Sequence, residues 1–204
     1  GILIVWFTFG HYKFSRFSLG KVVPAAKWKA MTICTMPSLG FTMVFYSIMN
    51  LFHLDFVPKQ IMEMSYLGFL PFNIMGSFIS VYIFFGAIQE ELIRCGKKRW
   101  VQLLTLSIMM LPASMMSATP SGDINVDLTV LGFISLCYCS WIYGKTRSTI
   151  ILIVLYFVSN LVPFHFESKA LGILLLIAGT ALTIGGFAVL SRKLPEMLVK
   201  DENE

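Results

Sequence analysis

The chain has 204 residues, of which 56% are hydrophobic and 13% are charged, and its formal net charge is +5. A soluble domain of this length is about half apolar and about a quarter charged. This chain has too much apolar surface for one water-facing core. The composition therefore excludes an ordinary soluble domain and indicates that lipid is the solvent for much of the chain.

Six apolar stretches are long enough to be considered as transmembrane helices, which need about 20 residues. A further apolar run at residues 1–10 covers about half a bilayer, and we expect it to be the end of a span that begins earlier. The sequence predicts an all-α, polytopic transmembrane bundle with one domain over 1–200 and an acidic, truncated tail at 201–204. The six predicted spans are 28–52, 66–88, 100–118, 126–143, 149–163 and 170–191.

The basic residues predict the orientation of the bundle. All 16 Lys and Arg residues except Lys59 and Lys169 lie in alternate loops or at the span ends beside them. Because Lys and Arg concentrate on the cytoplasmic side of membrane proteins, we expect these loops and the C-terminus in the cytoplasm, and the composition favours a bacterial plasma membrane. Orientation and attraction to anionic lipid explain the positive charge, so we expect no nucleic-acid partner.

Small residues recur along one stripe of the last predicted span, at Ala178, Ala181 and Gly185. Small side chains let two helix backbones approach closely in a membrane. The stripe predicts close packing, either against another helix of this chain or against a partner subunit.

The end of the second predicted span carries a polar cluster, Gln89-Glu90-Glu91-Leu-Ile-Arg94. Polar groups at membrane depth are costly unless they are partnered, which makes them candidates for function. Glu90 and Arg94 are four residues apart, so they share a helix face and can form an ion pair. The alternative is a helix end whose charges reach into the headgroups and water.

This cluster resembles the Glu-Glu-x-x-x-Arg signature of the CPBP intramembrane protease family, also called Abi, with Gln89 in place of the first Glu. The family includes CAAX-processing proteases and bacteriocin-immunity proteins. Farther along, a span, a Gly-Lys-x-Arg-Ser turn and a second span look like the family's final motif region. There Asn160 matches the motif's Asn, and Tyr156 stands where the family has His. The resemblance in architecture extends over about residues 28–191.

The departures from the family pattern bear on mechanism. In the family, glutamates and histidines are taken to hold or activate the attacking water. The amide of Gln89 cannot accept a proton from water, and Tyr156, with a reference pKa of about 10, is a poor replacement for imidazole. The predicted span 100–118, where the family's middle motif has a His, contains none.

The resemblance therefore implies a non-catalytic member without a cofactor. Such a protein would act as a scaffold, regulator or immunity factor for a membrane or cell-wall partner. Glu90 and Arg94 would then be structural, tying the helix end to neighbouring backbone or to Asn160.

Two other functions stay open. An active intramembrane metallo- or glutamic endopeptidase of the CAAX-processing type would use Glu90, Glu91 and Arg94, with zinc as the metal if one is needed. A small transporter component is the second alternative, although no predicted span has a charge at its centre. Four outer-loop residues could supply zinc ligands if their loops meet; they are His53, Asp55, His165 and Glu167.

Overall fold

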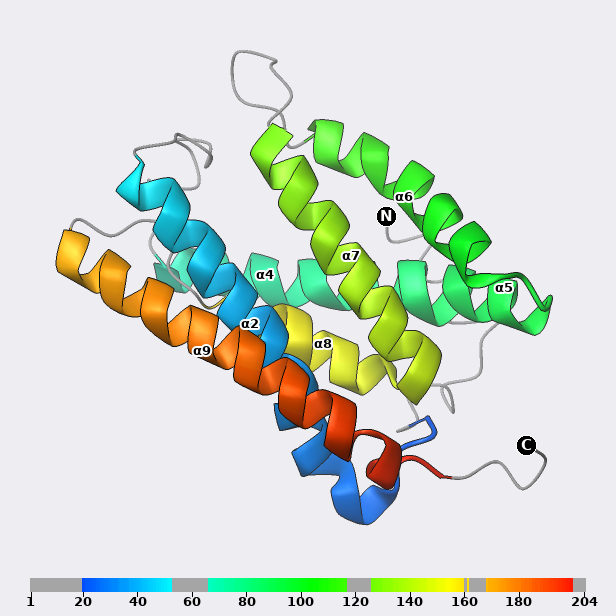
Figure 1. Cartoon of the computed structure of the whole chain (residues 1–204). Coiled ribbons are helices and arrows are strands. Elements are labelled where there is room, and N and C mark those ends of the chain that lie inside the picture. Colours follow the sequence, from blue (N-terminus) through cyan, green and yellow to red (C-terminus); the bar gives the residue numbers. More distant parts are fainter. Residues whose placement is uncertain (1–19, 53–65, 117–125, 160, 162–167, 200–204) are drawn as a thin grey trace.

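The computed structural model describes residues 20–52, 66–116, 126–159, 161 and 168–199, and its elements in these residues are all helical (Figure 1). The predicted all-α class is confirmed for this part of the chain. Short 3-10 turns, η2 (Pro24–Ala26) and η4 (Pro195–Met197), flank the first and last long helices. The longer elements are α2 (Lys27–Leu51), α4 (Tyr66–Ser80), η3 (Val81–Gln89), α5 (Glu90–Arg94), α6 (Arg99–Met116), α7 (Val126–Thr146), α8 (Thr149–Ser159) and α9 (Lys169–Lys193).

Each predicted span is represented by a helix. Within the described residues, three helices are long and apolar enough to cross a membrane: Pro24–Leu51, Ile74–Arg94 and Lys169–Lys193. The helix α8 has 11 residues. At about 1.5 Å per residue it covers roughly half of a bilayer core. The six complete spans of the prediction are therefore not shown by the described residues. The partial span at 1–10 and the tail at 201–204 lie outside these residues.

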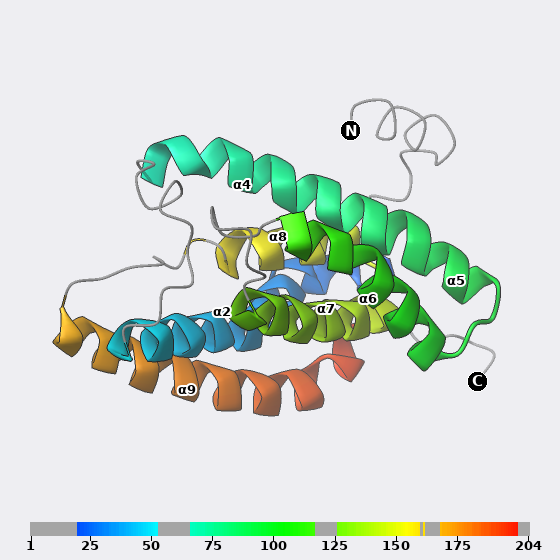
Figure 2. The same cartoon turned by 90° about the horizontal axis from the view of Figure 1, so that it is seen from above.

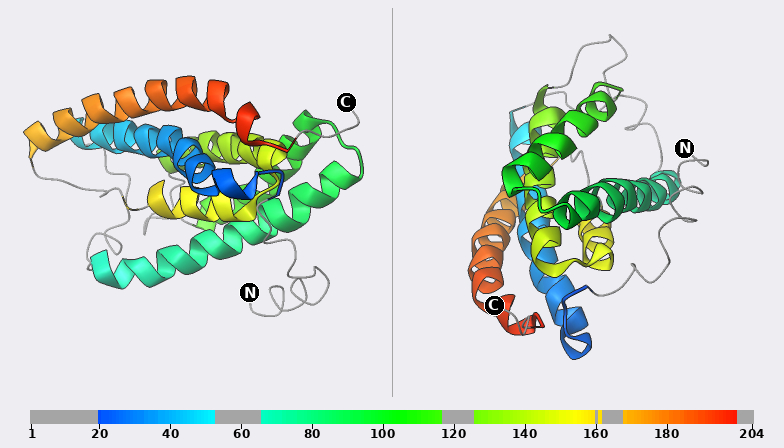
Figure 3. Two further views of the ribbon diagram at one scale, coloured as in Figure 1. Left: turned by 90° about the horizontal axis from the view of Figure 1, so that it is seen from below. Right: turned by 90° about the vertical axis from the view of Figure 1, so that its right-hand side faces the viewer.

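The helices form layers around one core. In Figures 2 and 3, α9 lies on one side of the bundle and the continuous helix of α4, η3 and α5 lies on the opposite side, with α2, α7 and α8 between them. Six helices contribute fully buried side chains to the same core cluster. Examples are Cys34 of α2, Phe85 of η3, Leu106 of α6, Ile142 of α7, Leu152 of α8 and Leu190 of α9.

Helices α2 and α9 pack antiparallel with their backbones close together. A Cβ added at Gly40 would lie 2.6 Å from the carbonyl oxygen of Gly179, and one added at Gly186 would lie 2.9 Å from the backbone nitrogen of Pro37. Because no side chain larger than hydrogen fits at these positions without a shift, the three glycines set the distance between the two helices.

The predicted small-residue stripe of α9 is not the face that packs on α2. Ala181 is exposed, and a Cβ added at Gly185 would meet no atom within 4 Å. Of the two alternatives for this stripe, packing against another helix of this chain is not found for Ala181 and Gly185, while Ala178 is half-buried. The neighbouring face, with Gly179 and Gly186, makes the close contact instead.

Backbone hydrogen bonds join three basic segments at one end of the bundle. The Lys21 N–H donates to the Thr146 carbonyl at 2.7 Å, and the Val199 N–H donates to the Lys21 carbonyl at 2.7 Å. Gly20, with φ of 62°, lies directly against the Thr146–Arg147 backbone, where a side chain would collide. The entry to α2, the α7–α8 turn and the segment after α9 therefore meet.

Candidate functional site

Glu90 lies at the same end of the bundle and is bound from two helices. Its Oε2 accepts a hydrogen bond from the Tyr143 hydroxyl at 2.9 Å and forms an ion pair with Arg147 Nη1 at 2.9 Å. Arg94 Nε lies 3.6 Å from the other carboxylate oxygen. The predicted Glu90–Arg94 pair is thus confirmed, but its arginine is about half exposed. Because exposed pairs contribute little, Arg147 and Tyr143 are the stronger partners.

Arg147 reaches Glu90 from the short turn between α7 and α8. Its φ of 53° is in the left-handed region, which is uncommon for a residue other than glycine. The turn is fixed to the end of α7, since the Arg147 N–H donates to the Tyr143 carbonyl at 2.8 Å and the Thr146 hydroxyl donates to the Ile142 carbonyl. A fixed backbone therefore aims the guanidinium at α5.

Gln89 is 1% exposed and joins the same helix end to α6 and α7. Its Nε2 donates to the Ser140 carbonyl at 3.0 Å and the Ser140 hydroxyl at 2.9 Å, and lies 3.3 Å from Gln102 Oε1. Gln102 in turn donates to the Lys97 carbonyl at 2.8 Å. A carbonyl oxygen accepts but never donates, so the amide nitrogen of Gln89 must face Ser140. Its Oε1 is buried and has no partner in the part of the chain that the structure describes.

The helix segment directly before Glu90 is π-helical, from Val81 to Gln89. Such segments are rare in proteins and are found frequently at functional sites. Phe85 at its centre is fully buried, with its ring centroid 6.3 Å from that of Tyr143 and 6.4 Å from that of Tyr156. Aromatic packing thus fixes the π-helical segment against α7 and α8.

The other predicted site residues are not brought to Glu90. Tyr156 is partly buried beside Phe85 and forms a hydrogen bond with Cys139. Glu91 is exposed, and no ion pair is found for it among the described residues. Within the same residues there is no group of three or more His, Cys, Asp or Glu arranged to hold a metal. Five predicted site residues lie outside the described ranges, namely Asn160, His53, Asp55, His165 and Glu167.

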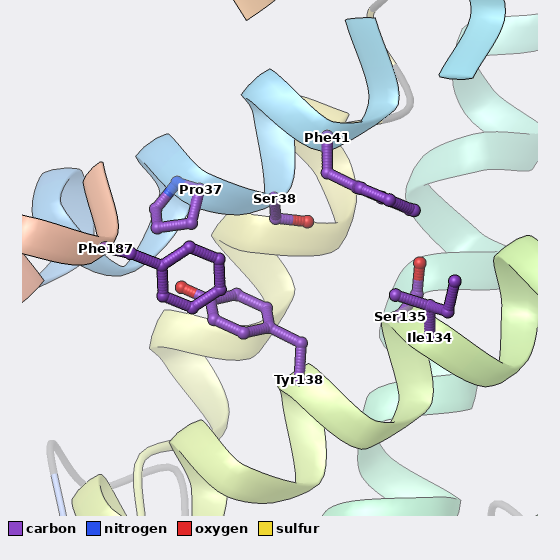
Figure 4. Close-up of a pocket in the computed structure, with 7 residues that line it drawn as sticks. All are labelled: Pro37, Ser38, Phe41, Ile134, Ser135, Tyr138 and Phe187. Carbon is purple, nitrogen blue, oxygen red and sulfur yellow. The ribbon is translucent and has the colours of Figure 1, made fainter. Parts of the chain in front are cut away.

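A separate cavity of about 60 Å³ lies between α2, α7 and α9 (Figure 4). Pro37, Tyr138 and Phe187 are part of its wall, and the Tyr138 hydroxyl donates to the Cys34 carbonyl at 2.6 Å. The described lining contains aromatic, aliphatic and hydroxyl groups but no carboxylate or imidazole. This cavity therefore offers no group that could activate a water, and it is not an extension of the Glu90 site.

Sequence reasoning missed the partners that define the site. Tyr143 and Arg147 are 53 and 57 residues from Glu90, and Ser140 is 51 residues from Gln89. The one usable signal was Arg147, a basic residue in the Gly-Lys-x-Arg-Ser turn on the same predicted side as Glu90.

The arrangement is suited to holding helices together. Glu90 forms ion pairs with one arginine from its own helix and one from the α7–α8 turn, while Gln89 contacts Ser140 of α7 and Gln102 of α6. Both contacts at 2.9 Å are to Oε2, so one oxygen of the Glu90 carboxylate joins the long helix to α7 and to the α7–α8 turn.

Comparison of the chain with protein-family models, with curated proteins and with solved structures gives no match. The resemblance to the CPBP family therefore depends on the residues of the motifs alone.

Proposed function

We propose that this chain is a non-catalytic, CPBP-like membrane protein that acts as a scaffold, regulator or immunity factor for a membrane or cell-wall partner. The observation that supports this proposal best is the environment of Glu90, whose carboxylate is held by Tyr143 and Arg147 at 2.9 Å each. Tyr143 of α7 and Arg147 of the α7–α8 turn both bind Oε2, so the carboxylate links the long helix to α7 and to this turn. These contacts give Glu90 a structural role that needs no substrate.

The neighbouring residue supports the same proposal. A hydrolytic site of the resembled type needs a second acid at position 89, and this chain has a buried amide there. The amide is bonded to Ser140 on α7. Gln89 and Glu90 thus both form contacts between helices that need no substrate.

The partner surface in this proposal is the outward face of α9. Ile177 and Ile184 are 64% and 67% exposed, and Ala181 and Gly185 beside them are also exposed. A face that combines large apolar side chains with small ones can accept a partner helix at close range. In the cell this protein would be a multi-pass plasma-membrane protein with its basic end and C-terminus in the cytoplasm.

Two measurements test the function. The first is cleavage of a prenylated peptide and of a leader peptide by the purified chain. We expect the same background rate for the parent and for Glu90→Ala. Cleavage that disappears in Glu90→Ala would contradict the proposal and favour the endopeptidase.

The second measurement is cross-linking in native membranes followed by identification of the bound protein. We expect one membrane or cell-wall protein to be captured by the parent and lost from the double variant Ala181→Leu/Gly185→Leu. The matched control is Ile108→Ala on α6, an exposed apolar position on another helix, which should keep the partner. Equal capture by the parent and the double variant would show that this face of α9 is not used.

A further inference from the structure

An apolar groove runs between α2 and α8. It has a volume of about 310 Å³ and is lined by Trp28, Met31, Met36 and Leu39 of α2 with Val154 and Val158 of α8. Two threonines also line it, but their hydroxyls donate to the backbone of their own helix, Thr32 to the Trp28 carbonyl and Thr35 to the Met31 carbonyl. The groove therefore presents hydrocarbon to its contents.

The length of the groove fits one leaflet of a bilayer. From Trp28 to Leu39 the helix advances 11 residues, which is about 16 Å at 1.5 Å per residue. The hydrocarbon core of a bilayer is about 30 Å thick, so one leaflet contributes about half of that. Trp28 is 75% exposed, as expected for an aromatic side chain at the membrane surface. At the other end, the Ser38 and Ser159 hydroxyls are bonded at 2.9 Å and join α2 to α8.

The surface end of the groove is positively charged. Lys27 and Lys29 flank Trp28 in the first turn of α2, which contains no acidic residue. The Lys27 Nζ lies 5.4 Å from the centroid of the Trp28 ring, over its face. Neither lysine forms an ion pair with another described residue. Lys27 and Lys29, which have no counterion among the described residues, thus lie where a lipid headgroup would lie.

We propose that this groove is a binding site for one anionic phospholipid. The acyl chain lies along α2 between Trp28 and Leu39, and the headgroup phosphate is held by Lys27 and Lys29. The apolar lining alone would accept any acyl chain. The two lysines supply the preference for a negative headgroup, since each basic residue near an anionic membrane surface contributes about 1 kcal/mol. The inference requires that the basic end faces the membrane surface, but it does not depend on the scaffold function.

The test uses the full chain reconstituted in vesicles of equal phosphatidylglycerol and phosphatidylcholine with identical acyl chains. After extraction in a mild detergent, mass spectrometry counts the lipids that stay bound. We expect about one phosphatidylglycerol per chain and a preference of at least about tenfold over phosphatidylcholine. Lys27→Gln/Lys29→Gln should reduce this preference at least about tenfold. Lys169→Gln replaces an exposed lysine at the first residue of α9. This variant should leave the preference for phosphatidylglycerol unchanged.

Filling the groove provides an independent arm. Met36→Trp and Val158→Trp each place a large side chain in the groove and should lower bound phosphatidylglycerol below about a tenth per chain. Ile177→Trp, at a position of α9 that is 64% exposed, should retain the bound phosphatidylglycerol. Circular dichroism during heating verifies that each variant folds, and two filling variants guard against failure of one.

Either of two results would overturn the proposal. The first is equal retention of the two lipids by the parent chain. The second is retention of phosphatidylglycerol that survives both filling variants, as it would if the lipid were bound elsewhere or if another part of the chain occupied the groove.

Discussion

At the scale of single residues, the two motif positions are distinguished by what their neighbours can donate or accept. Around Glu90 the neighbours are donors, Tyr143 and Arg147. Around the nitrogen of Gln89 they are acceptors, the Ser140 carbonyl and hydroxyl. The environment at position 89 therefore favours an amide over a carboxylate. The acceptors on Ser140 of α7 thus explain why this position departs from the Glu-Glu motif.

Restoring the family motif with Gln89→Glu should consequently damage the protein. A carboxylate at this buried position would face the Ser140 carbonyl oxygen and lie one residue from Glu90. Burying an uncompensated charge costs about 3 kcal/mol or more. We expect a clear fall in the free energy of unfolding, measured in detergent micelles, and no gain of peptide cleavage.

The control for this substitution is Glu91→Gln at the exposed neighbouring position. It should change the unfolding free energy by less than about 0.5 kcal/mol. A Gln89→Glu variant as stable as its parent would show that position 89 tolerates an acid and would reopen the endopeptidase.

Residue-scale prediction from the sequence succeeded where the partners were local. The Glu90–Arg94 pair follows from a spacing of four residues on one helix, and the structure contains it. The Arg147 and Tyr143 partners depend on how α7 packs beside the long helix, and no local pattern encodes that packing.

At the scale of elements, α9 has two small-residue faces with different uses. Gly172, Gly179 and Gly186 are buried and recur every seven residues, a spacing that keeps one face directed at a neighbouring helix. Gly185 lies one position away and faces open space. The sequence predicted the helix and its small residues but could not tell which face packs on α2, since both faces satisfy the same compositional rule.

The adjacent glycines give a matched pair of substitutions. Gly186→Leu would force its side chain into Pro37, 2.9 Å from the position of the new Cβ. Such overpacking costs about 1–3 kcal/mol. We expect Gly186→Leu to lower the melting temperature, measured by circular dichroism, and Gly185→Leu to leave it almost unchanged.

Because both variants replace a helical glycine with leucine, the difference between them removes the effect of helix propensity. Equal melting temperatures for the two variants would contradict the close packing of α9 on α2.

At the scale of the whole molecule, segments that carry basic residues contact one another at one end of the bundle. The basic segments that the sequence places on one side of the membrane are joined directly, through Lys21 to Thr146 and through Glu90 to Arg147. The all-α class and the positions of the six helices were predictable from runs of apolar residues. Six complete spans are not shown by the described residues, in which α8 extends over the 11 residues Thr149–Ser159.

The central claim concerns Glu90, which connects the long helix to α7 and to the α7–α8 turn and so helps hold the basic end of the bundle together. Its most direct test is the thermal unfolding of Glu90→Gln beside the parent chain in the same lipid nanodiscs. The account predicts a lower unfolding temperature, because the substitution leaves the partly buried Arg147 without its counter-charge. An unchanged or higher unfolding temperature would contradict it, since a carboxylate retained for chemistry is commonly held at a cost in stability.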